Sequence, residues 1–586
     1  MYNLRMRKHH ILSLLMVLII SVFTFRDSLS LSLFGDDWLV LYIFKNQALH
    51  WSSYLSPYGP TYLLMGVIDK FFGLNPFPYF VTSLFFRYLA AVFLYALIFL
   101  LTRNRLSAFA AGLFWAVSEI GIETTNWVFN MNSYLGLSLF LITVIFLLKY
   151  HQTFKKRYLA ISVSFLFLSV IAVPVRMHGA FIVLFLMELF YLFSGWRGLV
   201  SLKKFFLINL IWFCSFLILS GWRVFGSGSG NFDTYIGKGL RENAIATQNG
   251  NYSHLLLPLT TIGNMLFTDQ FMNNIQIPRV IYKTQNLSWM KSFLAPLSII
   301  FSLVFVILGA LLVERQKRII FAIVSSVLIF ALALIINSFV RNNIYSMSPN
   351  SIFLTLAGGA FIILSTLLIV FTKQKNIKTG LFLGLIWLVG FAAVPMIFTP
   401  LSYIPSSMRY IILPGVAIPI VVGLLFTLAK STTQKILLLI LISPVYLIQY
   451  YSTQAYFKNL LVSRSESISQ VIWENILTKL PVMDPKKDYL FYFEPKNGND
   501  SIVRDVITFG FIPRMIVYGK TPDRPGGIYV VERPREFISA ITDGEELKRF
   551  NWGIAKKIDV NNSFAFSLES DYSLTDIKSQ ILYGNR

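Results

Sequence analysis

Cysteine is almost absent from the sequence. The one cysteine among the 586 residues, Cys214, lies inside an apolar run, so an internal disulfide is excluded and cysteine usage does not reveal the redox compartment. Charged residues are also scarce. They make up 13% of the chain, and 55% of the chain is hydrophobic, whereas roughly a quarter of a typical soluble protein is charged. The composition therefore argues against a soluble protein.

Several catalytic motifs are missing as well. The sequence contains no P-loop, no G-x-S-x-G elbow, no H-E-x-x-H and no Cys/His cluster with metal-ligand spacing. The six histidines are scattered along the chain. We therefore assign no residue to a metal site.

Long apolar runs are abundant. Runs of roughly 17 to 22 residues recur from Ile11 to Tyr450, which is the length needed to cross ~30 Å of hydrocarbon. They predict a polytopic α-helical membrane protein with about 13 transmembrane helices. The first run lacks a small-residue cleavage site, which favours an uncleaved anchor over a signal peptide. The expected spans are 11–29, 81–101, 107–124, 132–149, 158–174, 179–195, 203–221, 293–313, 319–340, 351–372, 381–399, 411–429 and 436–452.

The net charge is +23, and the placement of the basic residues indicates a membrane role for this charge. They gather in every second link between apolar runs, as the positive-inside rule expects. This placement predicts a multi-pass protein of the cell membrane with a cytoplasmic N-terminus and, because the span count is odd, an extracytoplasmic C-terminus. No nucleic-acid partner is expected. The basic links contain Arg5, Arg7 and Lys8; Arg103 and Arg105; Lys155, Lys156 and Arg157; Lys203 and Lys204; Arg315, Lys317 and Arg318; Lys373, Lys375 and Lys378; and Lys430 and Lys435.

The links expected on the outer side have a different character. The link 30–80 contains "SPYGPTYLLMGVIDKFFG", which predicts an amphipathic interfacial helix after turn-forming prolines. The link 222–292 opens with "GSGSGN", which is flexible by composition and predicts either a lid over a lipid or an unstructured surface loop.

The composition changes after Tyr450, where the apolar runs stop. "DYLFYFEP" and "GGIYVVERP" are typical of strands, and "SRSESISQVIWENILTKL" of an amphipathic helix. We therefore expect a transmembrane module over residues 1–452 and a small extracytoplasmic α/β domain over residues 453–586.

Two neighbouring aspartates, Asp36 and Asp37, follow the first apolar run in "SLFGDDWLVLYIF". Partial desolvation and their mutual charge both raise a carboxyl pKa, and a carboxylate with a raised pKa is a better base at neutral pH. Adjacent residues do not share a face, so one is expected to act while the other orients or binds. An interfacial helix cap explains the pair equally well, because Asp favours helix starts.

Cationic side chains are expected on the same side of the membrane as these acids. The forked guanidinium group matches phosphate oxygens, although arginines near a membrane often only reach lipid head groups. An acid and several arginines at one face suggest a phosphorylated, membrane-borne substrate. The cations in question are Arg87, Arg176, His178, Arg341 and Arg409.

A polar turn between the third and fourth spans reads "EIGIETTNWVFNMNSYLGL". Its carboxylates, amides and aromatic rings suit the hydroxyls and apolar faces of a sugar, and they suit a plain polar turn that caps two helices equally well. Acids within the membrane are functional candidates by default. The polar and aromatic residues of this turn are Glu119, Glu123, Asn126, Trp127, Asn130, Asn132 and Tyr134.

These motifs, in this order, resemble the GT-C superfamily of membrane glycosyltransferases, particularly the bacterial branch related to protein mannosyltransferases and lipid A aminoarabinose transferase. The resemblance lies in "GDDW" after the first span, the interfacial "SPYGPTYLLMGVIDKFFG", the arginine of "LFFRYLAAVFLYALIFL", the turn ending in tyrosine and the late "SSMRYIILPGVAIPIVVGLL". It covers residues 11–195 and 399–429.

The resemblance implies a GT-C-like fold and an inverting glycosyltransferase. The implied donor is a polyprenyl-phosphate-linked sugar, and the acceptor is a glycan, a lipid or a protein. Asp36 matches the base, Asp37 would orient the acceptor or assist, and Arg409 and Arg176 match donor-phosphate ligands. Some relatives need a divalent metal and others do not, so this question stays open.

The remaining candidates complete the expected site. Arg341, which follows the ninth span, is a further candidate ligand of the donor phosphate. The residues expected to contact sugar or acceptor are Glu123, Asn126, Tyr134, Arg87 and His178.

The sequence departs from the family pattern in three ways. The second acid is Asp where many relatives have Glu, the histidine usual before the prolines of the first loop is missing, and the W-W-D-Y-G signature does not occur. The last absence argues against en bloc glycan transfer to asparagine. Three other interpretations stay open: a transporter or lipid flippase without covalent chemistry, a polysaccharide polymerase or ligase, and a non-catalytic scaffold.

Overall fold

The structure is a computed structural model of the chain. It describes residues 2–46, 58–174, 176–193, 202–226, 231–250, 253–268, 271, 294–341, 349–398, 408–481, 483–484, 486–496, 498–520, 527–543 and 557–584.

Long apolar helices form most of the molecule. Within the described ranges, nine helices are long and apolar enough to cross a membrane. They lie in α1 (Tyr2–Phe25), α5 (Pro76–Thr102), α8 (Asn132–Thr153), α10 (Gly179–Phe193), α11 (Leu202–Gly226), α16 (Arg318–Arg341), α17 (Pro349–Phe371), α18 (Lys375–Phe398) and α21 (Thr432–Arg464). The other expected spans coincide with α6 (Arg105–Val117), α9 (Lys156–Ala172), α15 (Leu294–Leu312) and α20 (Ala417–Leu428). The expected polytopic α-helical fold is confirmed.

Polar residues in the links start several of these helices. The Asn75 side chain accepts a hydrogen bond from the backbone N–H of Phe77 at the start of α5, and Asn104 accepts from two backbone N–H groups at the start of α6. Ser431 and Gln434 form a capping box that opens α21. Each cap provides an acceptor for backbone donors that a helix start leaves unpaired.

Short helices gather at one end of this bundle. They are α2 (Asp36–Asn46), α4 (Gly59–Phe72), α7 (Ile122–Asn126) and α19 (Ile412–Gly415), with the 3₁₀ turns η1 (Arg26–Ser30), η2 (Val128–Met131), η3 (Arg176–His178) and η9 (Met408–Tyr410). The helix α4 falls in the stretch expected to be an interfacial helix. A further 3₁₀ turn, η7 (Arg315–Lys317), joins α15 to α16.

The expected link 222–292 is partly helical. It contains α12 (Asn231–Gln248) and α13 (Ser253–Leu266), and α13 packs closely against α17, because a Cβ on Gly263 would lie 1.8 Å from the carbonyl oxygen of Leu354. Sequence analysis missed α13, which is too short to read as a span. Most of the "GSGSGN" stretch, the expected lid, lies outside the described residues.

The C-terminal region, residues 466–584, contains a four-stranded sheet. Its strands are β1 (Tyr489–Pro495), β2 (Ile528–Val531), β3 (Ser563–Leu568) and β4 (Leu574–Asp576), and its helices are α22 (Glu466–Lys479), α23 (Asp500–Ile502), α24 (Phe511–Val517), α25 (Pro534–Thr542) and α26 (Lys578–Tyr583). The strand order is β2-β1-β3-β4. β1 pairs in parallel with β2 and β3, and β3 pairs antiparallel with β4.

The central strand β1 is buried on both faces, as expected for a strand in the middle of a parallel sheet. Phe491 on one face contacts Phe511 of α24 at 5.0 Å between ring centroids. Tyr492 on the other face contacts Phe537 of α25 at 6.1 Å. The strands and the helix expected from sequence are thus present as β1, β2 and α22.

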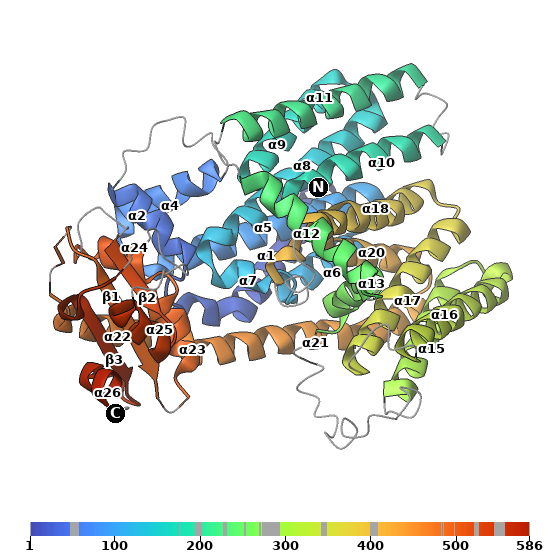
Figure 1. The fold of residues 1–586 in the computed structure, drawn as a ribbon. Coiled ribbons are helices and arrows are strands. Elements are labelled where there is room, and N and C mark those ends of the chain that lie inside the picture. The colour runs from blue at the N-terminus through green and yellow to red at the C-terminus, as the bar shows by residue number, and fades with distance from the viewer. Residues whose placement is uncertain are drawn as a thin grey trace.

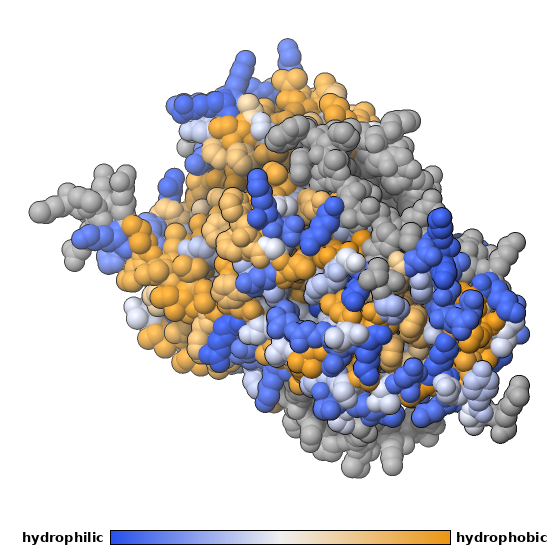
Figure 2. Space-filling model, turned by 90° about the vertical axis from the view of Figure 1, so that its left-hand side faces the viewer, coloured by the Kyte–Doolittle hydropathy of each residue, from blue (hydrophilic) through white to orange (hydrophobic). Residues whose placement is uncertain are grey.

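A single long helix, α21, joins the two parts of the molecule. It crosses from the membrane helices to the C-terminal region, which lies beside α2 and α4 (Figure 1). The boundary expected at residue 452 falls within this helix. In the view toward this end, hydrophilic residues cover much of the lower right, whereas hydrophobic residues gather at the upper left (Figure 2).

Candidate active site

The segment before α2 is shaped to place the two aspartates against the C-terminal region. Gly35 has a φ of +54°, and a Cβ there would lie 1.9 Å from the ring of Phe509. Only glycine fits both the backbone and the space. Phe34 contacts the same ring, at 4.8 Å between centroids.

Asp37 is fully buried. Its Oδ2 accepts a hydrogen bond of 3.0 Å from the backbone N–H of Phe34, and its Oδ1 accepts one of 2.7 Å from that of Phe129. Burial raises the pKa of Asp37 to about 7, although the two backbone donors and the charge of Arg464 oppose this rise. These contacts fix the start of α2 against η2.

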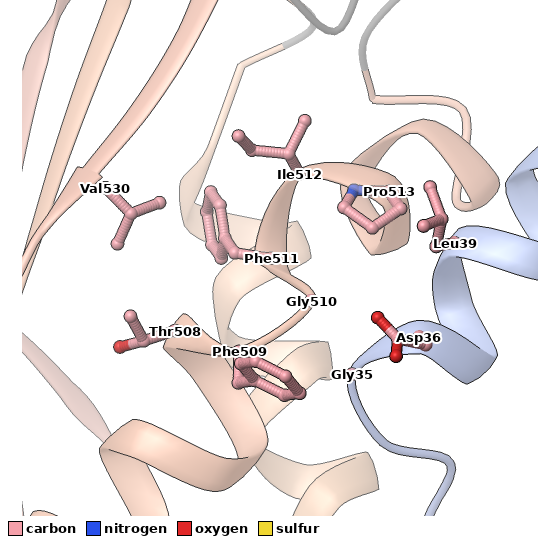
Figure 3. Close-up of a pocket in the computed structure, with 10 residues that line it drawn as sticks. All are labelled: Gly35, Asp36, Leu39, Thr508, Phe509, Gly510, Phe511, Ile512, Pro513 and Val530. Carbon is pink, nitrogen blue, oxygen red and sulfur yellow. The ribbon is translucent and has the colours of Figure 1, made fainter. Parts of the chain in front are cut away.

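Asp36 is more accessible than its neighbour. It lines a cavity of about 230 Å³ together with Leu39, residues 508–513 and Val530. Its carboxylate points toward the loop that carries Phe509 and Gly510 (Figure 3). Burial raises the pKa of Asp36, and the positive charge of Arg409 opposes the rise. The charge of Arg409 therefore acts on the Asp36 carboxylate.

Arg409 and Arg176 form a second cluster. Arg176 Nη1 donates to Ser133 Oγ at 2.9 Å and to the Arg409 carbonyl oxygen at 3.1 Å. The backbone N–H of Arg409 donates to Glu123 Oε2 at 3.4 Å. Tyr410 packs against both guanidinium groups, at 5.0 and 5.2 Å from its centroid. These contacts bring together Glu123, Arg176 and Arg409, and the charge of Arg409 also acts on Asp36.

Trp127 connects the arginine cluster to the C-terminal region. The Arg409 guanidinium lies 4.7 Å from the centroid of its ring, and Phe509 packs against the same ring at 5.7 Å. Trp127 Nε1 is buried, and none of the described residues accepts a hydrogen bond from it. An indole N–H is normally paired when buried, and Trp127 Nε1 departs from this rule among the described residues.

Asn126 is nearly buried and joins three segments. Its Nδ2 donates to the Tyr456 hydroxyl, and its carbonyl oxygen accepts from Arg464 Nη2 at 2.9 Å. Arg464 also donates to the Ser32 carbonyl oxygen at 3.3 Å and packs on Phe34 at 3.9 Å. Asn126 thus lies behind the site, within the framework that joins α21 to the segment before α2.

Arg87 and Tyr134 lie deeper in the protein. Both are fully buried, and Arg87 Nη1 donates to the Tyr134 hydroxyl at 2.5 Å. Arg87 also donates to carbonyl oxygens of Trp115, Ser118 and Ile120. These contacts hold the end of α6 and the turn after it, and neither side chain lines the Asp36 cavity.

One expected residue, His178, is not brought to this cluster, and the position of another, the Arg341 side chain, is not described. The ring of His178 lies near α11, where Nε2 is 3.3 Å from Ser220 Oγ and Phe216 contacts the ring at 5.8 Å. Arg341 is the last residue of α16, and its side chain lies outside the described part of the chain.

Sequence analysis missed the contribution of the C-terminal region. Arg514 of α24 lies 4.3 Å from the ring centroids of both Trp38 and Trp473, and its Nη2 donates to Ser469 Oγ at 3.0 Å. It thereby joins α2 to α22. Burial lowers the pKa of Arg514 to about 10. A single arginine within a short apolar helix such as α24 does not indicate such a contact from the sequence of one protein.

The arrangement combines one accessible carboxylate with two guanidinium groups. A half-buried carboxylate with a raised pKa can accept a proton, and guanidinium groups bind an oxyanion with forked donors. Among the described residues, no three or more His, Cys, Asp or Glu side chains lie close enough together to hold a metal ion. The chemistry available is thus proton abstraction beside an anion-binding cluster.

Comparisons with known proteins give structural neighbours only. No protein-family model matches the sequence, and neither does any curated protein. Among solved structures the chain is similar to the Archaeoglobus fulgidus oligosaccharyltransferase in complex with Zn and sulfate, with 11% identity, a TM-score of 0.39 and coverage of 89% of this chain and 62% of that one. It is also similar to ArnT from Cupriavidus metallidurans bound to undecaprenyl phosphate, with 12% identity, a TM-score of 0.32 and coverage of 96% and 93%.

Both neighbours are GT-C glycosyltransferases. This is the superfamily that the sequence motifs resemble. The chain spans less than two thirds of the length of the archaeal oligosaccharyltransferase. At these identities and TM-scores the similarity assigns no role to any residue, so the roles of Asp36 and the arginines depend on their own geometry.

Proposed function

We propose that the protein is an inverting glycosyltransferase that moves a sugar from a polyprenyl-phosphate donor to an acceptor at the extracytoplasmic membrane face. The observation that carries the proposal is the placement of Asp36 within electrostatic reach of Arg409, beside a cavity that the C-terminal region closes. A base and a phosphate-binding group are the two elements that this transfer needs.

In the proposed reaction the acceptor hydroxyl attacks the anomeric carbon of the donor sugar. The new bond joins the acceptor oxygen to that carbon, and the bond from the carbon to the phosphate oxygen breaks with inversion. The hydroxyl proton passes to Asp36, and the polyprenyl phosphate leaves with the bonding electrons. Arg409 and Arg176 stabilise the charge that develops on the leaving phosphate.

The other candidate residues have supporting roles. Asp37 orients α2 and thereby the base, because both of its oxygens accept backbone hydrogen bonds. Glu123 and Trp127, whose indole N–H has no acceptor among the described residues, are proposed to contact the sugar or the acceptor. Arg341 stays a proposed phosphate ligand on sequence grounds alone, and Asn126, Tyr134, Arg87 and His178 stay sugar or acceptor candidates on the same grounds.

The proposed orientation follows the charges. We place the links that contain Lys155, Lys373 and Lys430 on the cytoplasmic side, which puts Asp36 and the C-terminal region outside. The head group of a lipid donor and a polar acceptor meet at this surface, because neither enters hydrocarbon cheaply. The proposed partners are therefore the bilayer, the lipid-linked sugar and an acceptor of unassigned class.

The decisive experiment replaces Asp36 with Asn in the purified protein. Sugar transfer from a polyprenyl-phosphate donor should fall by about 10² to 10⁴, the typical contribution of a positioned base. Asp27→Asn is the matched control, since this acid lies on η1 near the same membrane surface, paired with Arg26 at 3.6 Å, and should keep full activity.

Mass spectrometry of lipid-linked sugars and surface glycans in a deletion strain identifies the substrates for this assay. Undiminished turnover by a folded Asp36→Asn protein would remove the catalytic assignment. A deletion strain that changes the distribution of a lipid across the membrane, with no glycan altered, would instead indicate a flippase.

A further inference from the structure

A basic cleft lies at the opposite end of the membrane helices from Asp36. It has a volume of about 450 Å³ and is formed where the links α15–α16, α17–α18 and α20–α21 meet. Lys430 follows the end of α20 and Arg409 lies before its start, so the 12 residues of α20, about 18 Å at 1.5 Å per residue, lie between them. Figure 1 shows α15, α16 and α17 grouped away from the C-terminal sheet. The cleft is thus separate from the proposed active site.

Four cationic side chains surround this cleft and one acid faces them. The cations are Arg315, Arg318, Lys373 and Lys430, and the acid is Glu314. Lys373 Nζ lies 3.2 Å from Glu314 Oε2, and the charges of Lys373, Lys317 and Lys430 all act on the Glu314 carboxylate. One carboxylate cannot balance this many cations, so the cleft carries a net positive charge and suits an anion.

The floor of the cleft is apolar. Leu312, Val313, Phe371 and Leu428 line it, and Leu312 and Val313 are 7% and 6% exposed. A cationic rim over an apolar floor, at the end of membrane helices, matches the two chemical parts of a phospholipid. A free phosphate would make no use of the apolar floor.

The polar groups of the cleft are held in place by helix ends. Arg318 lies over the end of α15 and donates to the carbonyl oxygens of Val313 and Leu311, each at 3.4 Å. Gln434 Nε2 of α21 donates to the Leu311 carbonyl oxygen at 2.7 Å. These bonds join α15, α16 and α21, so the cleft has a defined shape.

We propose that this basic cleft binds one phospholipid with an anionic head group. The phosphate contacts Arg315, Lys373 and Lys430, and the start of the acyl chains lies over the apolar floor. Basic pockets between membrane helices bind anionic lipid head groups by this combination of charge and apolar contact.

The test measures lipid retention by the full-length protein in detergent. The protein is titrated with phosphatidylglycerol or with phosphatidylcholine of the same acyl chains, and native mass spectrometry counts the bound lipids. We expect one phosphatidylglycerol to be retained at least tenfold more tightly than phosphatidylcholine. Equal retention of the two lipids would contradict the proposal.

Substitutions locate the lipid. The triple variant Arg315→Gln, Lys373→Gln and Lys430→Gln should weaken phosphatidylglycerol retention on the order of 100-fold. The control variant Lys155→Gln, Lys156→Gln and Arg157→Gln removes the same charge from exposed positions at the start of α9. The control variant should retain phosphatidylglycerol like the wild type. An equal loss of retention in both triple variants would show that general surface charge, and not the cleft, binds the lipid.

Two further measurements separate the remaining explanations. Glu314→Gln removes the acid that competes with the phosphate, so it should strengthen lipid retention about fivefold, which a misfolded protein would not do. Inorganic phosphate at millimolar concentration should not displace the lipid. Displacement by phosphate would show that the cleft binds a free anion, and the lipid assignment would fail.

Discussion

The two adjacent aspartates differ in their surroundings more than in their chemistry. Asp37 is enclosed and has both oxygens bound by backbone donors, whereas Asp36 faces a cavity and the charge of Arg409. Neighbouring residues at a helix start point in different directions. The proposed base therefore stands next to the residue that orients its helix.

Stability should depend on pH through Asp37. A carboxyl whose pKa rises from 3.8 to about 7 on folding binds more protons in the folded state between these values. The free energy of unfolding should therefore fall as pH rises from about 4 to 7 and level off above, as far as this group contributes. Asp37→Asn should remove this slope, which melting temperatures across the interval will report.

Asp37→Asn should also lower stability at every pH. An amide has one acceptor oxygen for two backbone donors, and a buried unpaired donor costs about 1–3 kcal/mol. If the melting temperatures of the wild type and Asp37→Asn changed in parallel across pH 4 to 7, this would contradict the titration of Asp37 in this range.

Arg409 provides a second prediction at this scale. Arg409→Ala removes the guanidinium near Asp36, so the donor KM should rise by about tenfold or more, because a hydrogen bond to a charged group contributes about 1.5–3 kcal/mol. Arg409→Lys keeps the positive charge but loses the forked hydrogen-bond donors, so its donor KM should lie between those of the wild type and Arg409→Ala. Steady-state kinetics with varied donor measure this change, and an unchanged donor KM for Arg409→Ala would remove its phosphate role.

At the scale of elements, α2 is held by the C-terminal region as much as by the membrane helices. Phe509 packs on Gly35, and Trp38 packs against Arg514 of α24. The backbone at Gly510 has a φ of +96° and approaches the Gly35 carbonyl oxygen. The position of Asp36 therefore depends on a loop that sequence alone does not connect with it.

Two glycines allow this contact to be tested. Gly35 and Gly73 both have positive φ, at 54° and 59°, but a Cβ on Gly73 would meet nothing within 4 Å. Gly73 also has a ψ of −136°, a backbone region that essentially only glycine adopts, so Gly73→Ala should cost about 1–3 kcal/mol for its backbone alone. Gly35→Ala should cost about 1–3 kcal/mol more, because it forces the Phe509 ring to move, and thermal unfolding in detergent measures both.

Shortening the opposing ring should reverse part of this loss. Phe509→Ala alone should lower stability. In the Gly35→Ala background it should lower stability less or raise it, because the smaller side chain relieves the clash with the new Cβ. A double-mutant cycle quantifies this coupling. Equal losses for Gly35→Ala and Gly73→Ala, with no coupling to position 509, would contradict the packing described for this loop.

For the whole molecule, the apolar runs predicted the helices well because hydrocarbon imposes a length and leaves few alternatives. The helix α13 was missed because its 14 residues fall short of a span and its burial comes from packing against α17. The C-terminal partners of Asp36 could not be predicted, since Phe509 and Arg514 contact α2 through tertiary packing that no local pattern encodes.

The membrane orientation is also a testable property of the whole molecule. Replacing Cys214 with Ser removes the one cysteine, and single cysteines can then be introduced at the exposed positions Lys487 and Lys155. A membrane-impermeant maleimide should label Lys487→Cys in intact cells and Lys155→Cys only after permeabilisation. The reverse pattern would place Asp36 on the cytoplasmic side.

The cavity beside Asp36 has one consequence for biosynthesis. The ribosome makes Phe509 about 470 residues after Asp36. The cavity walls that both provide do not exist until the C-terminal region has been translated and folded. A nascent chain already inserted in the bilayer, or one truncated before residue 508, therefore lacks the completed pocket however well its helices assemble.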